Sequence, residues 1–291
     1  MSRPLDVALA SCVNLPERDP DEALLSAALD GAGIRSAVLA WDDPQADFGS
    51  ARMTVLRSTW DYPHRPGAFD AWLERTAAAS ELWNPLPVLR WNLHKRYLLE
   101  AEAAGLPVVP TELVPCGSAA SLAEVSHRRR WDTMVVKPAV SAGSLRTIRI
   151  DRDDLEAGEA HLRELVAHRD VLVQKYLPSV EGYGERAVVW IDGELTHAIR
   201  KTTRFSGSDE SVSGGPVEIC SAEAALAGRA IDLARTTLGE PLLYARVDLA
   251  PDADGMPMIM ELELLEPSLY LEQSNRALRL FVEAIGRRLG S

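Results

Sequence analysis

Acidic and basic side chains share one predicted β-hairpin near the C-terminus. Two apolar stretches flank an Asp-Gly turn signal at residues 254–255. Because alternate residues of a strand share a face, tight closure on this turn places Asp248 opposite Glu261 and Arg246 opposite Glu263. Directly opposed carboxylates destabilise a sheet unless something neutralises them. The pattern predicts that Asp248, Glu261 and Glu263 hold a hard divalent cation, most simply Mg²⁺, which prefers carboxylates and phosphates. A solvated strand face is the alternative.

The same register predicts which face of this hairpin lies in the core. A second hairpin is predicted upstream. One face of the later strand is wholly apolar and is expected in the core; it carries Met258, Met260, Leu262 and Leu264. The upstream hairpin closes on the Asp-Gly signal at 192–193 and places Glu185 opposite Arg200. These two side chains form a cross-strand ion pair, or else Arg200 and Lys201 reach a phosphate.

Candidate phosphate-binding groups stand at the ends of two other predicted strands. Lys137 ends an apolar stretch, and the loop Ser141-Ala142-Gly143-Ser144 follows it with hydroxyls and amides that can cover phosphates. The segment Gln174-Lys175-Tyr176-Leu177 ends another buried strand, where backbone groups can pair with the edge of a purine. Taken singly, a surface lysine and a plain core strand are the alternatives.

Several other catalytic motifs are excluded. Residues 182–187 match the Gly-x-Gly-x-x-Ala dinucleotide fingerprint by letter, but a predicted strand follows them where a helix is required. The sequence contains no Gly-x4-Gly-Lys phosphate loop and no Gly-x-Ser-x-Gly elbow. Its six histidines lack metal-ligand spacing. Neither a serine hydrolase nor a histidine-based metal site has support.

The composition narrows the possible partners. The chain has 291 residues, 46% of them hydrophobic and 25% charged, as in an ordinary globular protein. Its formal net charge of −12 argues against a basic surface for nucleic acid. No apolar run approaches the ~20 residues that cross a bilayer. The first residues lack the build of a signal peptide, and three distant cysteines suit a reducing compartment. We expect a cytoplasmic protein that binds neither membrane nor nucleic acid.

A Pro-rich segment at residues 84–87 divides the pattern of elements. Before it, short apolar runs alternate with helical stretches, which is typical of a small parallel α/β unit. After it come a helix predicted over 92–104, mixed strands, and an amphipathic helix over about 271–289. We predict an N-terminal α/β domain at residues 1–91 and a second domain at 92–291.

In this order, these segments resemble the ATP-grasp superfamily of ligases. The likeness covers roughly residues 92–291 and rests on Lys95, Lys137 with its Ser/Gly loop, the 174–177 segment, the run 184–189, and Arg246-Val247-Asp248 with Glu261-Leu262-Glu263. The resemblance implies an ATP-grasp α/β fold. A small parallel N-terminal domain would precede two mixed-sheet α+β subdomains with ATP between them, and residues about 112–178 would cover the nucleotide.

The resemblance also implies residue roles, with ATP and Mg²⁺ as cofactors. Asp248, Glu261 and Glu263 would hold the metal, although many members carry Asn at the position of Glu263, so the number of metal ions can differ. The residues expected to bind ATP are Lys95, Lys137, Ser141, Gly143, Ser144, Gln174, Lys175, Tyr176 and Leu177, with either Glu181 or Glu185 on the ribose. The catalytic cations would be Arg246, Lys201 and Arg200.

The N-terminal segment of that family contributes substrate contacts. Arg57, Ser58 and Asp61 follow a predicted strand where such contacts are expected, and an Arg fork suits a substrate carboxylate. A structural turn with packed aromatics is the alternative. Together with Ser268, these residues are similar to a glutathione-synthetase-like branch. Within it, the resemblance implies a cyclo-ligase of antibiotic biosynthesis, which closes O-ureido-D-serine into D-cycloserine.

The expected reaction is an ATP- and Mg²⁺-dependent ligation of a small amino-acid-like substrate. A carboxylate attacks the γ-phosphate to give an acyl phosphate and ADP, and a nitrogen then displaces phosphate to form an amide-type bond. Three interpretations stay open: closure of one molecule into a ring, ligation of two molecules such as amino acids, and nucleotide binding without catalysis. A homo-oligomer is compatible with all three.

Overall fold

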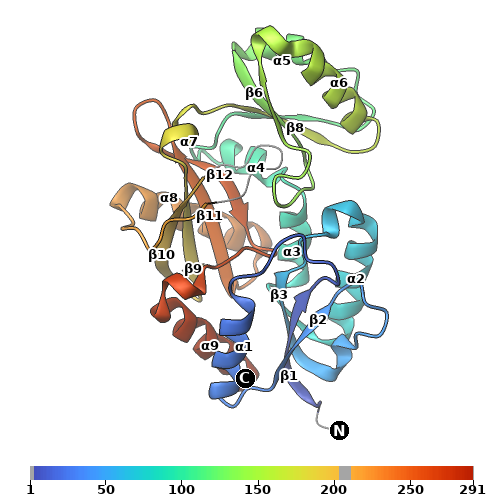
Figure 1. The fold of residues 1–291 in the computed structure, drawn as a ribbon, viewed down its shortest axis with the longest axis vertical. Helices are drawn as coiled ribbons and strands as arrows, with labels where there is room; N and C mark the ends of the chain where they lie inside the picture. Colours follow the sequence, from blue (N-terminus) through green and yellow to red (C-terminus); the bar gives the residue numbers. More distant parts are fainter. Residues whose placement is uncertain (1–2, 203–210, 291) are drawn as a thin grey trace.

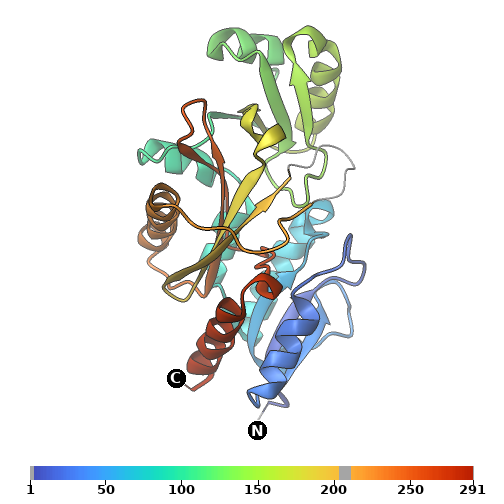
Figure 2. The same cartoon turned by 60° about the vertical axis from the view of Figure 1, so that its left-hand side comes forward.

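The computed structural model describes residues 3–202 and 211–290, whose strands form three four-stranded sheets (Figure 1). The N-terminal sheet lies at one end of the long axis, the central sheet lies beside and above it, and the upper sheet lies at the far end. Figure 2 shows the same order from a second direction. This mixed arrangement confirms the predicted α/β class.

The N-terminal sheet is parallel and has the strand order β2-β1-β3-β4. Both of its faces are covered: α1 and the C-terminal helix pack on one, and α2 on the other. Two-sided burial explains the continuous apolar runs of β1 and β3. The elements are β1 (Leu5–Ser11), α1 (Glu22–Gly31), β2 (Ser36–Ala40), β3 (Ala51–Ser58), α2 (Pro66–Ala79) and β4 (Glu81–Trp83), with 3₁₀ turns η1 (Phe48–Ser50) and η2 (Tyr62–His64).

The upper sheet is antiparallel and has the order β5-β8-β6-β7. Its elements are β5 (Thr111–Val114), α5 (Leu122–Arg129), β6 (Thr133–Pro138), β7 (Ile148–Asp151), η3 (Arg152–Asp154), α6 (Leu155–Val166) and β8 (Val171–Lys175). Val136 and Val173 pack into the core beneath α5 and α6. Because side chains alternate along a strand, Lys137 and Gln174 point to the opposite face.

The central sheet is antiparallel and has the order β10-β9-β11-β12. Helix α8 packs on β11 and β12, while α9 lies between this sheet and α1. The remaining elements are α3 (Leu86–Leu93), α4 (Tyr97–Ala103), α7 (Ser179–Gly182), β9 (Glu185–Ile191), β10 (Glu194–Lys201), α8 (Ser221–Leu238), β11 (Tyr244–Pro251), β12 (Pro257–Glu263), η4 (Leu271–Gln273) and α9 (Asn275–Gly290). In the described ranges, no helix has the length and apolar content that a membrane crossing requires.

The helix predicted over 92–104 is wrong as one continuous helix. Helix α3 ends at Leu93, His94 is extended, and α4 begins at Tyr97. The backbone N–H of Lys95 donates to the carbonyl oxygen of Ala139 at 2.8 Å, instead of continuing a helix. The break turns the Lys95 side chain toward the central sheet. Near the C-terminus, the predicted helix is likewise split into η4 and α9.

Both hairpins contain a bulge that the simple registers omit. In the later hairpin, the predicted pairs Asp248–Glu261 and Arg246–Glu263 are confirmed, but the register shifts by one between Asp248 and Leu249. The shift places Ile259, rather than Met258 and Met260, in the core beside Leu262. The prediction of one continuous apolar face is therefore wrong for the two methionines.

In the upstream hairpin, a bulge between Leu195 and His197 shifts the register of all later pairs. Lys201, not Arg200, lies opposite Glu185, so the predicted Glu185–Arg200 pairing is wrong. Because one slip reverses the faces of a strand, Arg200 is exposed and Lys201 is buried.

Two buried polar side chains join the N-terminal and central sheets. The Asn84 amide donates to the carbonyl oxygens of Tyr244 and Leu264 at 3.0 and 2.7 Å. Its oxygen accepts from the N–H of Leu243 at 2.7 Å. The Tyr244 hydroxyl donates to the carbonyl of Leu265 at 2.8 Å. These side chains thus supply hydrogen bonds to backbone groups at the start of β11 and just after the end of β12.

We expect Tyr244→Phe to lower the free energy of unfolding by about 1–2 kcal/mol, because the substitution keeps the ring and leaves a buried carbonyl without its donor. Urea unfolding followed by circular dichroism measures the change. Tyr183→Phe is the matched control, since that side chain is 41% exposed. Equal midpoints for the two variants would contradict the prediction.

Candidate active site

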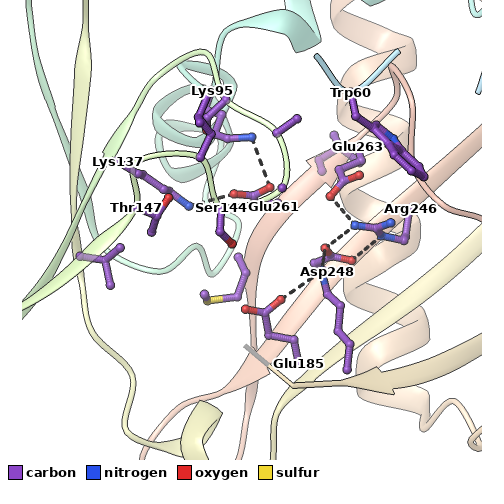
Figure 3. A pocket seen from close by; sticks show the side chains of 18 of the residues that line it. Trp60, Lys95, Lys137, Ser144, Thr147, Glu185, Arg246, Asp248, Glu261 and Glu263 are labelled. Carbon is purple, nitrogen blue, oxygen red and sulfur yellow. Dashed lines mark hydrogen bonds and ion pairs between the residues drawn. The ribbon is translucent and has the colours of Figure 1, made fainter. Parts of the chain in front are cut away.

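A cavity lies where the upper sheet, the central sheet and loops of the N-terminal sheet meet (Figure 3). The central sheet contributes most of its charged side chains, the upper sheet contributes Lys137 and the 174–177 segment, and the N-terminal loops contribute Trp60, Tyr62 and His64. Residues 141–147, which connect β6 to β7, form another wall. The cavity therefore draws on segments from the whole length of the chain.

Asp248 is the buried centre of one ion-pair cluster. Its carboxylate is 1% exposed and accepts hydrogen bonds from Arg246 at 2.8 and 3.0 Å and from Lys201 at 2.6 Å. Arg246 also donates to Glu263, and Lys201 contacts Glu185 at 3.2 Å. Burial lowers the pKa of Lys201, but Asp248 and Glu185 outweigh it and hold this pKa well above its ordinary value. The lysine therefore remains charged.

Glu261 is the centre of a second cluster. One carboxylate oxygen accepts from the ammonium of Lys137 at 2.9 Å, and the other accepts from Lys95 at 3.3 Å. Both lysines are buried. Burial raises the pKa of Glu261, but Lys137 and Lys95 outweigh it and hold this pKa well below its ordinary value. Figure 3 shows the three side chains converging from different segments.

Glu263 is buried beside other carboxylates, and its neighbours only partly compensate its ionised form. Burial, together with nearby Asp248 and Glu261, raises its pKa to about 8 against the opposing effect of Arg246. A divalent cation would relieve this repulsion, and carboxylates are the ligands that Mg²⁺ prefers. Within residues 3–202 and 211–290, however, no three such ligands are already grouped around a metal position. The donor set fits Mg²⁺, provided that Glu261 gives up its lysine contacts and Asp248 gives up part of its contacts with Arg246 and Lys201, which engage both of its oxygens.

The Ser/Gly loop and the 174–177 segment line the cavity as predicted. Ser141, Gly143 and Ser144 all contribute, and Ser144 lies beside Glu261 in Figure 3. Gly143 and Ser144 both have positive φ, at +57° and +58°, which folds the loop tightly over the cavity. The Gln174 side chain donates to Thr111 at 3.0 Å, which ties the segment to β5.

The structure separates the two glutamates considered for the ribose. Glu185 lines the cavity at the start of β9. Glu181, on α7, does not belong to the cavity lining; its carboxylate accepts from the Tyr176 hydroxyl at 2.6 Å and from Arg149. The geometry thus brings Glu185, and not Glu181 or the exposed Arg200, to the other predicted residues.

Three of the four residues predicted for substrate lie behind the cavity wall. Arg57 contacts Asp21 at 3.3 Å and donates to the carbonyl of Pro267 at 3.0 Å. Ser58 donates to Ser11, while Asp61 accepts from the Trp41 indole at 2.6 Å. Of the four, Ser268 alone belongs to the cavity lining. Arg57 therefore supports the segment that carries Ser268.

Sequence reasoning missed several side chains of the cavity. Trp60 and Tyr62 stand in the same run as Arg57 and Asp61, but their aromatic rings suggested packing. Thr147 extends the Ser/Gly loop by one turn. A third group lies around Ser268 and consists of Glu266 and Tyr270. Glu266 is a titratable residue two positions before Ser268, and this spacing could have indicated that it belongs to the site.

Comparisons with known proteins agree on one family. Residues 7–84 match the family model described as the N-terminal domain of D-cycloserine synthetase DcsG. The chain is 34% identical over 293 residues to the cycloserine biosynthesis protein DcsG of Streptomyces lavendulae, covering 97% of each sequence. The crystal structure of D-cycloserine synthetase DcsG superposes with a TM-score of 0.90 at 33% identity, covering 97% of this chain and 99% of the other.

A more distant structure identifies the fold. The ATP-grasp ligase PsnB, solved with a precursor variant, Mg and ADP, superposes with a TM-score of 0.66 at 18% identity. The match covers 98% of this chain and 99% of PsnB. The predicted ATP-grasp fold is confirmed, and ATP and Mg²⁺ are typical ligands of proteins with this fold.

If Arg57 supports the cavity wall, Arg57→Met should lower the free energy of unfolding by about 3–5 kcal/mol, because it leaves the carboxylate of Asp21 buried without its partner. Urea unfolding measures the loss. Adding Asp21→Asn should recover part of it, since the charge disappears while one oxygen remains as an acceptor for one of the two N–H groups, of Leu269 and Leu271, that now donate to separate Asp21 oxygens. If the two substitutions changed the free energy of unfolding additively, the buried pair between Arg57 and Asp21 would be refuted.

Proposed function

This chain belongs to the D-cycloserine synthetase DcsG family and has the ATP-grasp fold, and we propose that it closes O-ureido-D-serine into D-cycloserine in the cavity between its sheets. As a family member it is an ATP-dependent ligase that forms a C–N bond. The substrate and the roles of the individual residues are our proposal. The relatives support the choice of substrate, and the buried charges support the roles.

One observation carries the proposal: Glu261 lies between Lys95 and Lys137 on the same cavity as Asp248, Arg246 and Glu263. A protein that merely binds a small neutral molecule has no use for so many buried charges, whose desolvation is unfavourable. Phosphoryl transfer requires cations around the phosphates and carboxylates for a metal. The cavity contains both sets side by side.

The nucleotide would lie between the upper and central sheets. Lys95 and Lys137 would exchange Glu261 for phosphate oxygens, the Ser/Gly loop would cover the phosphates, and residues 174–177 would contact the adenine. Glu185 is placed to bind the ribose. Asp248, Glu261 and Glu263 would hold Mg²⁺, which supplies positive charge next to the phosphates when it is bound.

Arg246 would act where the substrate carboxylate meets the γ-phosphate. Its guanidinium is fixed by Asp248 and Glu263, and it also donates to the carbonyl of Ser268 at 3.1 Å. A cation held this rigidly can stabilise the charge of the transferred phosphoryl group without reorganising. The product would be an acyl phosphate, with ADP released.

Ring closure follows when the nitrogen bonded to the side-chain oxygen attacks the acyl carbon and expels phosphate. D-cycloserine lacks the carbamoyl group of O-ureido-D-serine. That group must therefore also leave, and a water molecule converts it to CO₂ and NH₃. Because both reacting groups belong to one molecule, holding it in a bent conformation replaces the encounter of two substrates.

Glu261→Gln should reduce ADP formation at least about 100-fold, because it removes both a metal ligand and the charge between the two lysines. A coupled ADP assay with ATP, Mg²⁺ and O-ureido-D-serine measures the effect. Glu156→Gln on the exposed side of α6 is the control. ADP formation at the unaltered rate would remove Glu261 from the metal and phosphate site.

O-ureido-D-serine alone should support ADP release, with equal amounts of ADP and cycloserine formed. A second amino acid should not accelerate the reaction, since a ring closure needs no partner. Mass spectrometry of the products together with the ADP assay tests this. ADP release that required two amino acids would identify a ligase of separate molecules instead.

A further inference from the structure

We propose that Glu266 is the catalytic base that takes the proton from the attacking nitrogen; the inference rests on the proposed ring closure. Glu266 lines the cavity and is 8% exposed. It follows β12 by three residues and faces the N-terminal loops. Neither the metal ligands nor the predicted ATP-binding residues include it.

The backbone on both sides of Glu266 is fixed. The Trp60 indole donates to the carbonyl oxygen of Glu266 at 2.9 Å, and Arg57 donates to that of Pro267 at 3.0 Å. Figure 3 shows Trp60 on the side of Arg246 and Glu263 that faces away from Lys137 and Thr147. The Glu266 carboxylate itself faces Lys95 and Tyr62, whose hydroxyl also lies 3.4 Å from the carbonyl oxygen of Ser141, so it lies where the N-terminal loop meets the phosphate-covering loop, next to the place where the substrate carboxylate is expected to meet the γ-phosphate.

Glu266 also differs from the carboxylates around it in its salt bridges. Asp248, Glu261, Glu263 and Glu185 each form a salt bridge with a lysine or an arginine. Among the residues that the structure describes, none forms a salt bridge with Glu266. Its carboxylate therefore keeps oxygen lone pairs that can accept a proton from a substrate.

The surroundings suit proton transfer near neutral pH. Burial raises the pKa of Glu266 to about 7, and the charged or hydroxyl groups facing it are Lys95 from the helix break, Tyr62 from the N-terminal loop and Arg246 from β11, which oppose this shift. A base is most efficient when its pKa lies near the working pH. Glu266 can therefore both accept the proton and release it afterwards.

The step is balanced as follows. The N–H bond of the nitrogen attached to oxygen breaks, and the proton moves to a Glu266 carboxylate oxygen. The nitrogen electron pair forms the bond to the acyl carbon, and phosphate leaves with the electrons of its C–O bond. Formation of the acyl phosphate precedes this step and does not need the base.

Glu266→Gln tests the proposal because it separates the two half-reactions. Added hydroxylamine attacks an acyl phosphate without help and gives a hydroxamate. We expect the variant to form ADP and hydroxamate within about threefold of the unaltered protein, while cycloserine formation falls about 100-fold or more. Glu272→Gln, an exposed acidic residue nearby, is the matched control and should retain both activities.

Each other outcome overturns the assignment. Equal losses of hydroxamate and cycloserine, with a higher KM for O-ureido-D-serine, would make Glu266 an anchor for the substrate instead. Unchanged cycloserine formation would exclude any role in catalysis. If the unaltered protein forms no ADP from O-ureido-D-serine, the proposed function itself fails, which is distinct from either result.

Discussion

The need to neutralise buried charge at one point organises this protein. Four carboxylates and four cations meet around the β11–β12 hairpin, and each carboxylate contacts at least one cation. Isolated charges would be strongly unfavourable so far from water. The cations come from the helix break at Lys95, from β6, from β10 and from β11. Elements that are far apart in the sequence must therefore close on this hairpin before its charges are neutralised.

That constraint links the resting arrangement to the reaction. Glu261 and its two lysines neutralise one another, so ATP and Mg²⁺ would replace existing ion pairs rather than add uncompensated charge. The lysine charges would pass to phosphates while the carboxylate charges pass to a metal. Because Lys137 belongs to the upper sheet and Glu261 to the central sheet, we expect the exchange to change how these two sheets approach each other.

The sequence predicted the parts of the site that follow from local rules, and it failed where contacts are distant. Tight closure on the Asp-Gly turn predicted the pairs Asp248–Glu261 and Arg246–Glu263, which are correct only because the bulge offsets a looser loop, next to which Ala250 pairs with Met258. A bulge between Asp248 and Leu249 lies beyond such rules, and so does the bulge that moves Lys201 into the site. The break that frees Lys95 depends on a hydrogen bond to Ala139, 44 residues away in the numbering.

Arg57 illustrates the same limit within the N-terminal unit. A guanidinium binds a substrate carboxylate or a protein carboxylate equally well, and only the fold reveals that one nitrogen of Arg57 contacts Asp21. Asp21 in turn accepts from the N–H groups of Leu269 and Leu271, near the other end of the chain. Local sequence could not indicate these contacts among Arg57, Asp21 and the segment 267–271, because the three segments meet only after folding.

The net charge of −12 then has a limited meaning for ligand binding. Charges on the surface are screened by salt over about 8–10 Å, whereas buried pairs are screened far less. An anionic nucleotide in the cavity would respond mainly to Lys95, Lys137 and Arg246, each within the protein interior. The acidic surface disfavours polyanions that must spread over it, such as nucleic acid, and leaves a single triphosphate bound at one point almost unaffected.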